Sequence, residues 1–184
     1  MSDDLLFPHG GYRKLITYKL GVLIYDATVA FCNQYISIKS RTHDQMVQAA
    51  RSGVANIAEG SQVSGTSKKI ELKLIDIARG SQSELLFDYE RFLAQRELPV
   101  WDSESAPAKF VRETRPQTLP QLRRLMVKLV SDLSDKNNIK QEVAANTMIC
   151  LIYQEIFLLN RQLARLGAIL KKMAALRNEC TTSG

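Results

Sequence analysis

The 184-residue sequence has few of the residues from which metal and catalytic sites are usually built. Its only histidines are His9 and His43, and its three cysteines, Cys32, Cys150 and Cys180, lie far apart. No CxxC pair or Cys/His ligand spacing is present, which argues against a zinc site. The sequence also lacks GxSxG, HExxH and GxxxxGK[ST], the signatures of serine hydrolases, zinc proteases and phosphate-binding loops. These absences predict that the protein is not an enzyme.

Proline and glycine are also scarce, with five and nine residues respectively. The prolines lie outside the long apolar-periodic segments, at Pro8, Pro99, Pro107, Pro116 and Pro120. Because proline inside a helix removes a backbone hydrogen bond, this placement favours helices over those segments. No alternating apolar–polar run of strand length is present. The sequence therefore predicts an all-α protein.

The chain lacks an uninterrupted apolar run of the ~18 residues that a transmembrane helix needs. Its first residues, MSDDLLFPHG, are acidic and have no hydrophobic signal core. We therefore expect a cytoplasmic protein with no membrane partner. Residues 1–11 are expected to be a flexible leader, 12–178 a single helical domain, and 179–184 a frayed tail.

Helical periodicity is strong over most of the chain. It predicts helices over about 12–36, 43–61, 68–95 and 119–133, and a last helix of about 40 residues from Asp135 or Asn138. Thr42 and Gln45 have the spacing of a capping box for the second helix, and Ser67 is a good cap for the third.

The predicted fold is an antiparallel up-down four-helix bundle with a long C-terminal helix. Around 40 helical residues would span ~60 Å, so the end of the last helix, from about Ala168, should extend beyond the others. Residues 97–120 interrupt the pattern and are expected to form a proline-containing connection with one short helix over 105–113. Trp101 in this connection should fold back onto the bundle, since a lone indole is seldom left fully exposed.

The stretch 41–92 contains small residues that would let two helices pack closely. Among them lie Arg51, Asn56, Glu59 and Glu84. Because buried charge must be paired, we expect an ion pair from Arg51 to Glu59 or Glu84, with direct ligand contact as the alternative. The acidic residues of this stretch have no Glu-x-x-His pairs, so a di-iron site is not expected, nor is any cofactor.

Seven cationic positions are candidates for contact with a phosphate backbone. They are Arg123, Arg124, Lys128, Arg161, Arg165, Lys171 and Lys172. The net charge of +6 permits a nucleic-acid partner, but a solvated helix face explains such residues equally well. No aromatic residues interleave with them in the sequence, which argues against stacking on single-stranded bases. Contacts with the backbone of a duplex or a folded RNA would fit better.

Four segments carry a resemblance to a known superfamily. They are TYKLGVLIYDATVAFC, DQMVQAARSGVANIAEGS, TSKKIELKLIDIARGSQSELLFDYERFL and ANTMICLIYQEIFLLNRQL. Over about 12–101 and 143–170 the chain resembles the four-helix-bundle proteins related to the 23S rRNA intervening-sequence proteins. This superfamily includes the accessory variability determinant of diversity-generating retroelements. The chain is most similar to the four helix bundle suffix domain.

The resemblance implies a four-helix bundle and, for the superfamily, a ring-like homopentamer with a basic surface. The retroelement accessory protein is similar in fold and binds nucleic acid and a reverse transcriptase. The matching motif marks structural positions at Arg51, Asn56, Glu59, Gly60, Gly80, Ser81 and Glu84. The sequence departs from the pattern at Gly53-Val54-Ala55, which is less charged than expected, and in its long last helix.

The leading hypothesis is a non-enzymatic accessory protein that self-associates. It would bind RNA or DNA of defined structure, or a nucleic-acid enzyme such as a reverse transcriptase, through a basic surface. The alternative is a purely structural homo-oligomeric interaction module without a nucleic-acid partner.

Overall fold

A computed structural model of the chain describes residues 11–133 and 138–182, with side chains as far as Asn178. Its secondary structure is entirely helical over these residues, which confirms the predicted all-α class. A short 3-10 helix, η1, precedes six α-helices. Their bounds are η1 Gly11–Lys14, α1 Ile16–Tyr35, α2 Arg41–Val63, α3 Lys68–Ala94, α4 Ala106–Thr114, α5 Leu119–Asp132 and α6 Ile139–Thr182.

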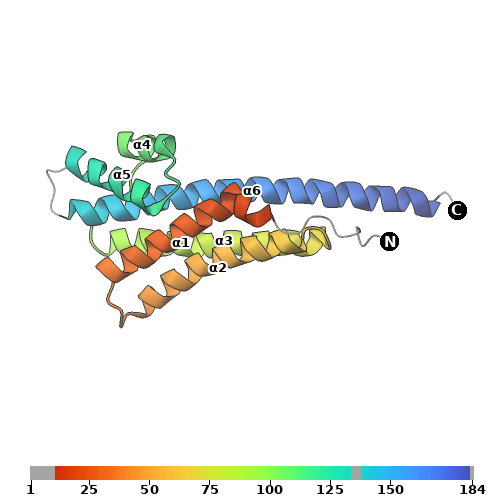
Figure 1. Ribbon diagram of the computed structural model, residues 1–184, viewed down its shortest axis with the longest axis horizontal. Helices are drawn as coiled ribbons and strands as arrows, with labels where there is room; N and C mark the ends of the chain where they lie inside the picture. Colours follow the sequence, from red (N-terminus) through yellow and green to blue (C-terminus); the bar gives the residue numbers. More distant parts are fainter. Residues whose placement is uncertain (1–10, 134–137, 183–184) are drawn as a thin grey trace.

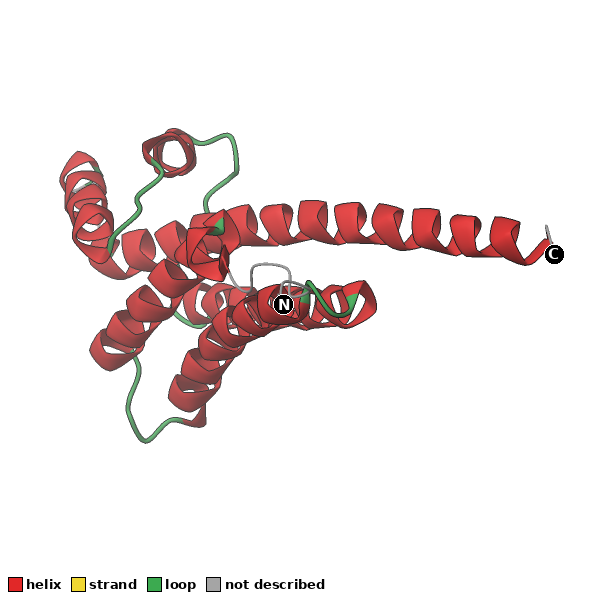
Figure 2. Ribbon diagram, turned by 45° about the vertical axis from the view of Figure 1, so that its right-hand side comes forward, coloured by secondary structure: helices red, strands yellow, loops and turns green. Residues whose placement is uncertain are grey.

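Four long helices, α1, α2, α3 and α6, pack on one another in cyclic order (Figure 1). The most extensive interface joins α2 to α3. Helices α1 and α3 lie diagonally and meet only through side chains, such as the Tyr89 hydroxyl that donates to Thr28 Oγ1 (3.1 Å). The two shorter helices, α4 and α5, pack on the first half of α6, outside this group (Figures 1 and 2). Helix α4 confirms the short helix predicted over 105–113.

Helix α6 is much longer than its neighbours. Its 44 residues span ~66 Å, and its C-terminal part projects beyond the other helices as an arm (Figures 1 and 2). Leu166 is the last buried residue, and every side chain from Lys171 to Asn178 is exposed. The backbone stays helical to Thr182, so most of the expected frayed tail, 179–184, belongs to α6. The expected leader lies outside the described residues, apart from Gly11 in η1.

By length and composition alone, one described helix could cross a membrane. The segment Ile139–Asn178 of α6 contains a window with mean hydropathy 1.3. However, 61% of that window is buried inside the protein. The core helix of a globular protein meets the same criterion, so this finding is weak support for a membrane span.

Serine residues cap two of the long helices. The Ser40 hydroxyl accepts a hydrogen bond from the Thr42 N–H (3.3 Å), so the predicted Thr42–Gln45 capping box is wrong. The reason is that α2 begins at Arg41, which places Thr42 inside the helix. The Ser67 cap of α3 is confirmed, since its hydroxyl accepts from the Ile70 N–H (3.3 Å).

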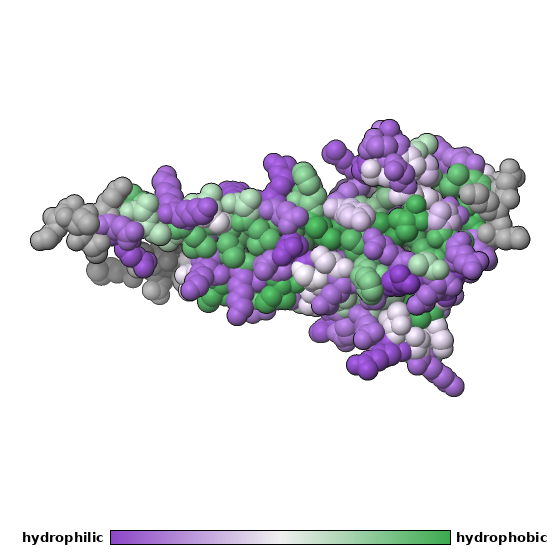
Figure 3. Space-filling view, turned by 180° about the vertical axis from the view of Figure 1, so that it is seen from behind, coloured by the Kyte–Doolittle hydropathy of each residue, from purple (hydrophilic) through white to green (hydrophobic). Residues whose placement is uncertain are grey.

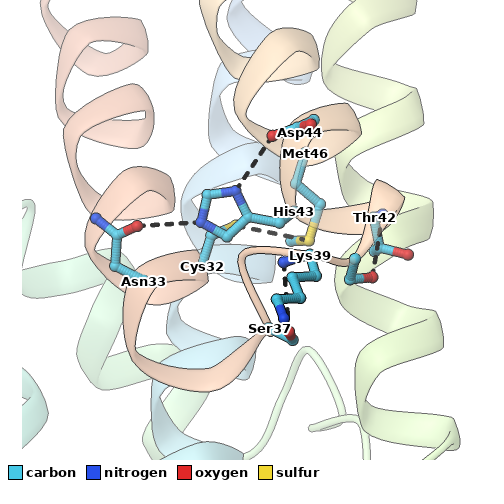
Figure 4. A network of polar contacts seen from close by, with 9 residues as sticks. Cys32, Asn33, Ser37, Lys39, Thr42, His43, Asp44 and Met46 are labelled. Carbon is cyan, nitrogen blue, oxygen red and sulfur yellow. Dashed lines mark hydrogen bonds and ion pairs between the residues drawn. The ribbon is translucent and has the colours of Figure 1, made fainter.

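Polar and sulfur contacts fix the end of α1 to the start of α2 (Figure 4). The ring nitrogen Nε2 of buried His43 lies 3.0 Å from the Asn33 Oδ1 atom. Nearby, the Cys32 thiol donates to the Met46 sulfur at 3.9 Å. Burial raises the pKa of Cys32 to about 12, so this thiol stays protonated near neutral pH. The cluster therefore joins two helices and contains no reactive thiolate.

The hydrophobic core consists of two clusters. The larger surrounds Leu23, Met46, Tyr89 and Ile152, and extends under α5. The smaller consists of Ile57, Ile75, Ala78, Leu159 and Leu166, from α2, α3 and α6. In each of these helices the sequence between the two clusters contains a buried polar residue or a glycine. The core is therefore interrupted by a polar layer.

Gly21, Gly53, Gln82 and Glu155 form this polar layer, one from each long helix. Gln82 and Glu155 are 0% exposed, and neither has a hydrogen-bond partner among the described residues. A methyl group added at Gly21 would lie 2.7 Å from Glu155 Oε1, and one added at Gly53 would overlap Gln82. Each glycine therefore makes room for the polar side chain of an adjacent helix, so the layer fixes the relative heights of the helices.

The Glu155 carboxyl group makes a testable contribution to stability. Burial raises its pKa from 4.5 to about 8, so the folded protein holds a proton that the unfolded chain releases above about pH 4.5. The free energy of unfolding should therefore fall by up to roughly 4 kcal/mol as the pH rises from 4.5 to 8, and then level off. Chemical denaturation of the wild type and of Glu155→Gln across this range measures the effect.

Glu155→Gln should remove this decline, because its amide cannot ionise. Glu59→Gln on the exposed face of α2 is the matched control and should keep it. A wild-type stability that is flat between pH 5 and 8 would contradict the burial of an unpaired carboxyl group.

Candidate nucleic-acid interface and adjoining groove

Some of the small residues predicted to pack α2 against α3 do so, whereas Ala55 and Gly80 face outward. The Ser52 and Ser81 hydroxyl oxygens lie 2.9 Å apart, and the Asn56 side-chain N–H donates to the Ser52 carbonyl at 2.8 Å. A methyl group added at Gly60 would lie 3.2 Å from Ile75, so the glycine permits close approach of α3. Two of the expected motif residues, Gly60 and Ser81, therefore lie at the interface between α2 and α3, and Asn56 bonds to Ser52 within α2.

The charged motif residues lie elsewhere. Arg51, Glu59 and Glu84 are exposed, and no ion pair joins them in the described part of the chain. The predicted ion pair is therefore not formed. The reason is helical spacing: Arg51 and Glu59 share an outward stripe of α2 with exposed Ala55, while the small residues face α3.

Gly80 and Glu84 lie on the outer face of α3. A methyl group added at Gly80 would have no neighbour within 4 Å. Phe87, one turn after Glu84, is 59% exposed. We call Ile77, Gly80, Glu84, Phe87 and Asp88 the outer face of α3. Burial, and to a smaller extent the nearby Glu84 carboxylate, raise the pKa of Asp88.

The seven predicted cationic residues fall into two groups. On α5, Arg123, Arg124 and Lys128 are exposed, and the Lys128 ammonium lies 4.6 Å from the centre of the Phe110 ring. Helix α5 packs beside the first turns of α6, around Val143. This position is ~25 Å before Arg161 along α6, so the structure does not bring the two groups together.

The second group lies on α6. Arg161, Arg165 and Lys172 are exposed and separated by four and seven residues, so they lie on one side of the helix and form a row. Lys171 points ~100° away from Lys172. The guanidinium carbon of Arg161 lies 5.9 Å from the centre of the Phe157 ring. An aromatic side chain therefore accompanies this row, which the sequence spacing had not indicated.

A groove of about 910 Å³ begins beside this row. Its walls are the first half of α1, the middle of α6, and the segment 100–117 with α4. Apolar side chains line most of it, including Leu20, Leu23, Ile149 and Leu158. Its edges carry four cations and one acidic residue: Lys19, Arg112, Arg115, Arg161 and Asp102. Seen from behind the view of Figure 1, the surface is a mixture of hydrophobic and hydrophilic side chains (Figure 3).

The connection before α4 is attached to α6 by hydrogen bonds. The Trp101 N–H donates to Asn146 Oδ1 (2.8 Å), and its indole N–H donates to Glu142 Oε1 (3.1 Å). The Asn146 side-chain N–H donates in turn to the Pro99 carbonyl (2.9 Å). This confirms that Trp101 folds back, and it places one wall of the groove.

The described residues contain no group of three His, Cys, Asp or Glu side chains able to hold a metal ion. Glu71 pairs with Lys68 (2.8 Å) and Asp76 with Arg79 (2.7 Å). Burial raises the pKa of Cys150, in the groove, to about 11, so this thiol stays protonated near neutral pH.

Comparison with protein-family models, with curated proteins and with solved structures gives no match.

Sequence reasoning missed the groove and the polar layer. The groove combines residues more than 100 positions apart, from Ile16 to Arg161, and no local pattern reports such a juxtaposition. The polar layer did have a signal: Glu155 interrupts an otherwise apolar row of the last helix. A charged residue at a core position of a helix could have indicated it.

The Asn146 contacts give a second prediction. Asn146→Ala leaves the Trp101 N–H and the Pro99 carbonyl without this partner, which should destabilise the protein by about 2 kcal/mol. Because Trp101 is the only tryptophan, its fluorescence should shift to longer wavelength as it gains water contact. An unchanged emission spectrum together with unchanged stability would show that the connection is held by other contacts.

Proposed function

We propose that the protein is a non-enzymatic helical accessory protein that self-associates and binds structured nucleic acid through the basic row of α6. The observation that carries this proposal is the row itself. Arg161, Arg165 and Lys172 lie along one side of α6 and lead into the part of the helix that projects beyond the others. The phosphate backbone of a duplex or a folded RNA is the ligand that such a row recognises.

From Arg161 onward, the described charged side chains of α6 are all positive. Between Arg161 and Asn178, α6 carries five cationic residues, Arg161, Arg165, Lys171, Lys172 and Arg177, and no acidic residue. No ion pair within the described residues engages Arg161, Arg165 or Lys172. Their positive field is therefore not cancelled within the chain, and it would attract a polyanion from several Å away.

The fold proposed for this function is an antiparallel up-down four-helix bundle of α1, α2, α3 and α6. The cyclic packing of these helices and the short turns from α1 to α2 and from α2 to α3 support it. The resemblance of the sequence to the intervening-sequence protein superfamily adds to this support. It also suggests the second element of the proposal, association with a nucleic-acid enzyme such as a reverse transcriptase in the cytoplasm.

One observation favours the alternative of an oligomeric module without nucleic acid. Met173 and Leu176 on the arm are 51% and 54% exposed. Exposed apolar side chains on a protruding helix are suited to contact with another protein chain. Both functions include self-association, so the binding of nucleic acid decides between them.

The test is binding of a fluorescently labelled RNA hairpin, measured by anisotropy as a function of salt. The wild type should bind, with a logarithmic salt slope of about −2 to −3 if three cations contact phosphates. Arg165→Glu/Lys172→Glu should reduce affinity by about tenfold or more at low salt, because it places two negative charges in the row.

Lys39→Glu/Arg41→Glu, at the exposed turn between α1 and α2, changes the net charge by the same amount and is the matched control. It should reduce affinity much less than the arm variant. No binding by the wild type at low salt, or equal losses for both variants, would contradict the role of the row and favour the structural alternative.

A further inference from the structure

We infer that the groove between α1, α4 and α6 receives the outer face of α3 from a second copy of the chain. This inference rests on the self-association included in the proposed function and names the two surfaces that carry it. The groove offers apolar walls with cations at its edges. The outer face of α3 offers exposed apolar side chains flanked by carboxylates, so the two surfaces complement each other.

The groove presents apolar surface with four cations and the acidic Asp102 at its edges. Ile16 at its edge is 70% exposed, and Val100 on the opposite wall is half exposed. Of the edge cations, Arg112 pairs with Glu104 (3.4 Å), whereas Lys19 and Arg115, like Arg161, make no ion pair in the part of the chain that the structure describes. Lys19 and Arg115 come from different walls, α1 and the end of α4, so the charges are not gathered at one point. An occupant with several acidic groups fits this arrangement better than one with a single anionic group.

The outer face of α3 has the opposite character. Phe87 and Ile77 are both exposed to water although they are large and apolar. Glu84 and Asp88 flank them, and neither forms an ion pair or a side-chain hydrogen bond within the described residues. The mutual repulsion of these carboxylates would be relieved by cations from a partner. An aromatic residue between acidic residues is the kind of anchor that fits an apolar groove with cationic edges.

Gly80 adds a geometric argument. Gly80 lies one turn before Glu84 and two turns before Phe87. A methyl group added at Gly80 would have no neighbour within 4 Å. A glycine on an exposed helix face allows a second helix to approach the backbone closely. Helical propensity alone does not favour glycine here, since it costs about 1 kcal/mol relative to alanine. The groove walls α1 and α6 are the helices that would make this approach.

The two surfaces lie on different sides of the molecule, because α1 and α3 are diagonal in the packing of the long helices. One chain can therefore use its groove for one neighbour and its α3 for another. Such head-to-tail contacts generate a closed ring when the rotation between copies closes, and a filament when it does not. An acidic partner of another kind would occupy the groove but would leave the outer face of α3 uncovered. The second copy accounts for both surfaces.

The experiment measures molar mass by light scattering after size exclusion, over a range of protein concentrations and at low salt. Wild type should form an oligomer. Lys19→Glu/Arg115→Glu reverses the groove charges, and Glu84→Lys/Asp88→Lys reverses those of α3. Each variant should associate at least about tenfold more weakly than the wild type, because like charges then face each other. The chain with all four substitutions should associate again, because its charges are opposite once more.

Lys39→Glu/Arg41→Glu and Glu59→Lys are matched controls on exposed parts of α2 and its preceding turn, and they should assemble as the wild type does. Circular dichroism confirms that each variant is folded, since all substituted side chains are at least partly exposed. Phe87→Ala tests the apolar anchor without a change of charge and should also weaken association.

A wild type that is monomeric at every concentration would overturn the inference, as would an oligomer that survives both charge reversals. Failure of the fourfold variant to associate would also count against it, if each pair of substitutions alone had dissociated the protein. None of these outcomes decides RNA binding, because none of the substituted residues belongs to the row of α6. The proposed function and this inference can therefore fail separately.

Discussion

The polar layer formed by Gly21, Gly53, Gln82 and Glu155 is the constraint on which the arrangement of the long helices depends. Apolar side chains in a helical core tolerate small shifts along the helix axes, because one leucine can replace another as a neighbour. The Glu155 carboxyl group packs over Gly21 and the Gln82 amide packs over Gly53, and these contacts do not tolerate such shifts. A shift of one turn would place each polar group against a side chain with no room for it. The layer thus lowers stability, by burying unpaired polar atoms, and fixes the register of the four helices.

This register determines what faces outward. With the small residues of α2 and α3 turned toward each other, Arg51, Glu59 and Glu84 are left at the surface. With Leu159 and Leu166 held in the smaller core cluster, Arg161, Arg165 and Lys172 are turned away from it. Beyond Leu166, none of the side chains described as far as Asn178 is buried. The surfaces available for function are therefore consequences of core packing, and the described residues contain no group of His, Cys, Asp or Glu side chains able to hold a metal ion.

The helices could be predicted from the sequence to within a few residues, because the 3.6-residue period of apolar side chains is a local signal. The Ser67 cap and the return of Trp101 to α6 were also predictable, the first from spacing and the second from the apolar area of an indole. The prediction of an ion pair from Arg51 was wrong, because closeness to small residues in the sequence does not show which side of a helix a charged residue occupies. The groove could not be predicted, since it depends on how α1, α4 and α6 diverge, and helix crossing has no local signature. The sequence suggested that the cations of α5 and α6 form one surface. They lie apart, because α5 packs beside the first turns of α6 and Arg161 lies further along that helix.

We propose that the protein acts through its outward surfaces as a self-associating, nucleic-acid-binding scaffold. Sedimentation velocity of the unmodified protein mixed with a labelled RNA hairpin tests it most directly, because one run reports the mass of the protein and the position of the RNA. At low salt the RNA should sediment with a protein oligomer, and at high salt it should separate from it. RNA that sediments alone at low salt, beside a protein of any mass, would contradict the account.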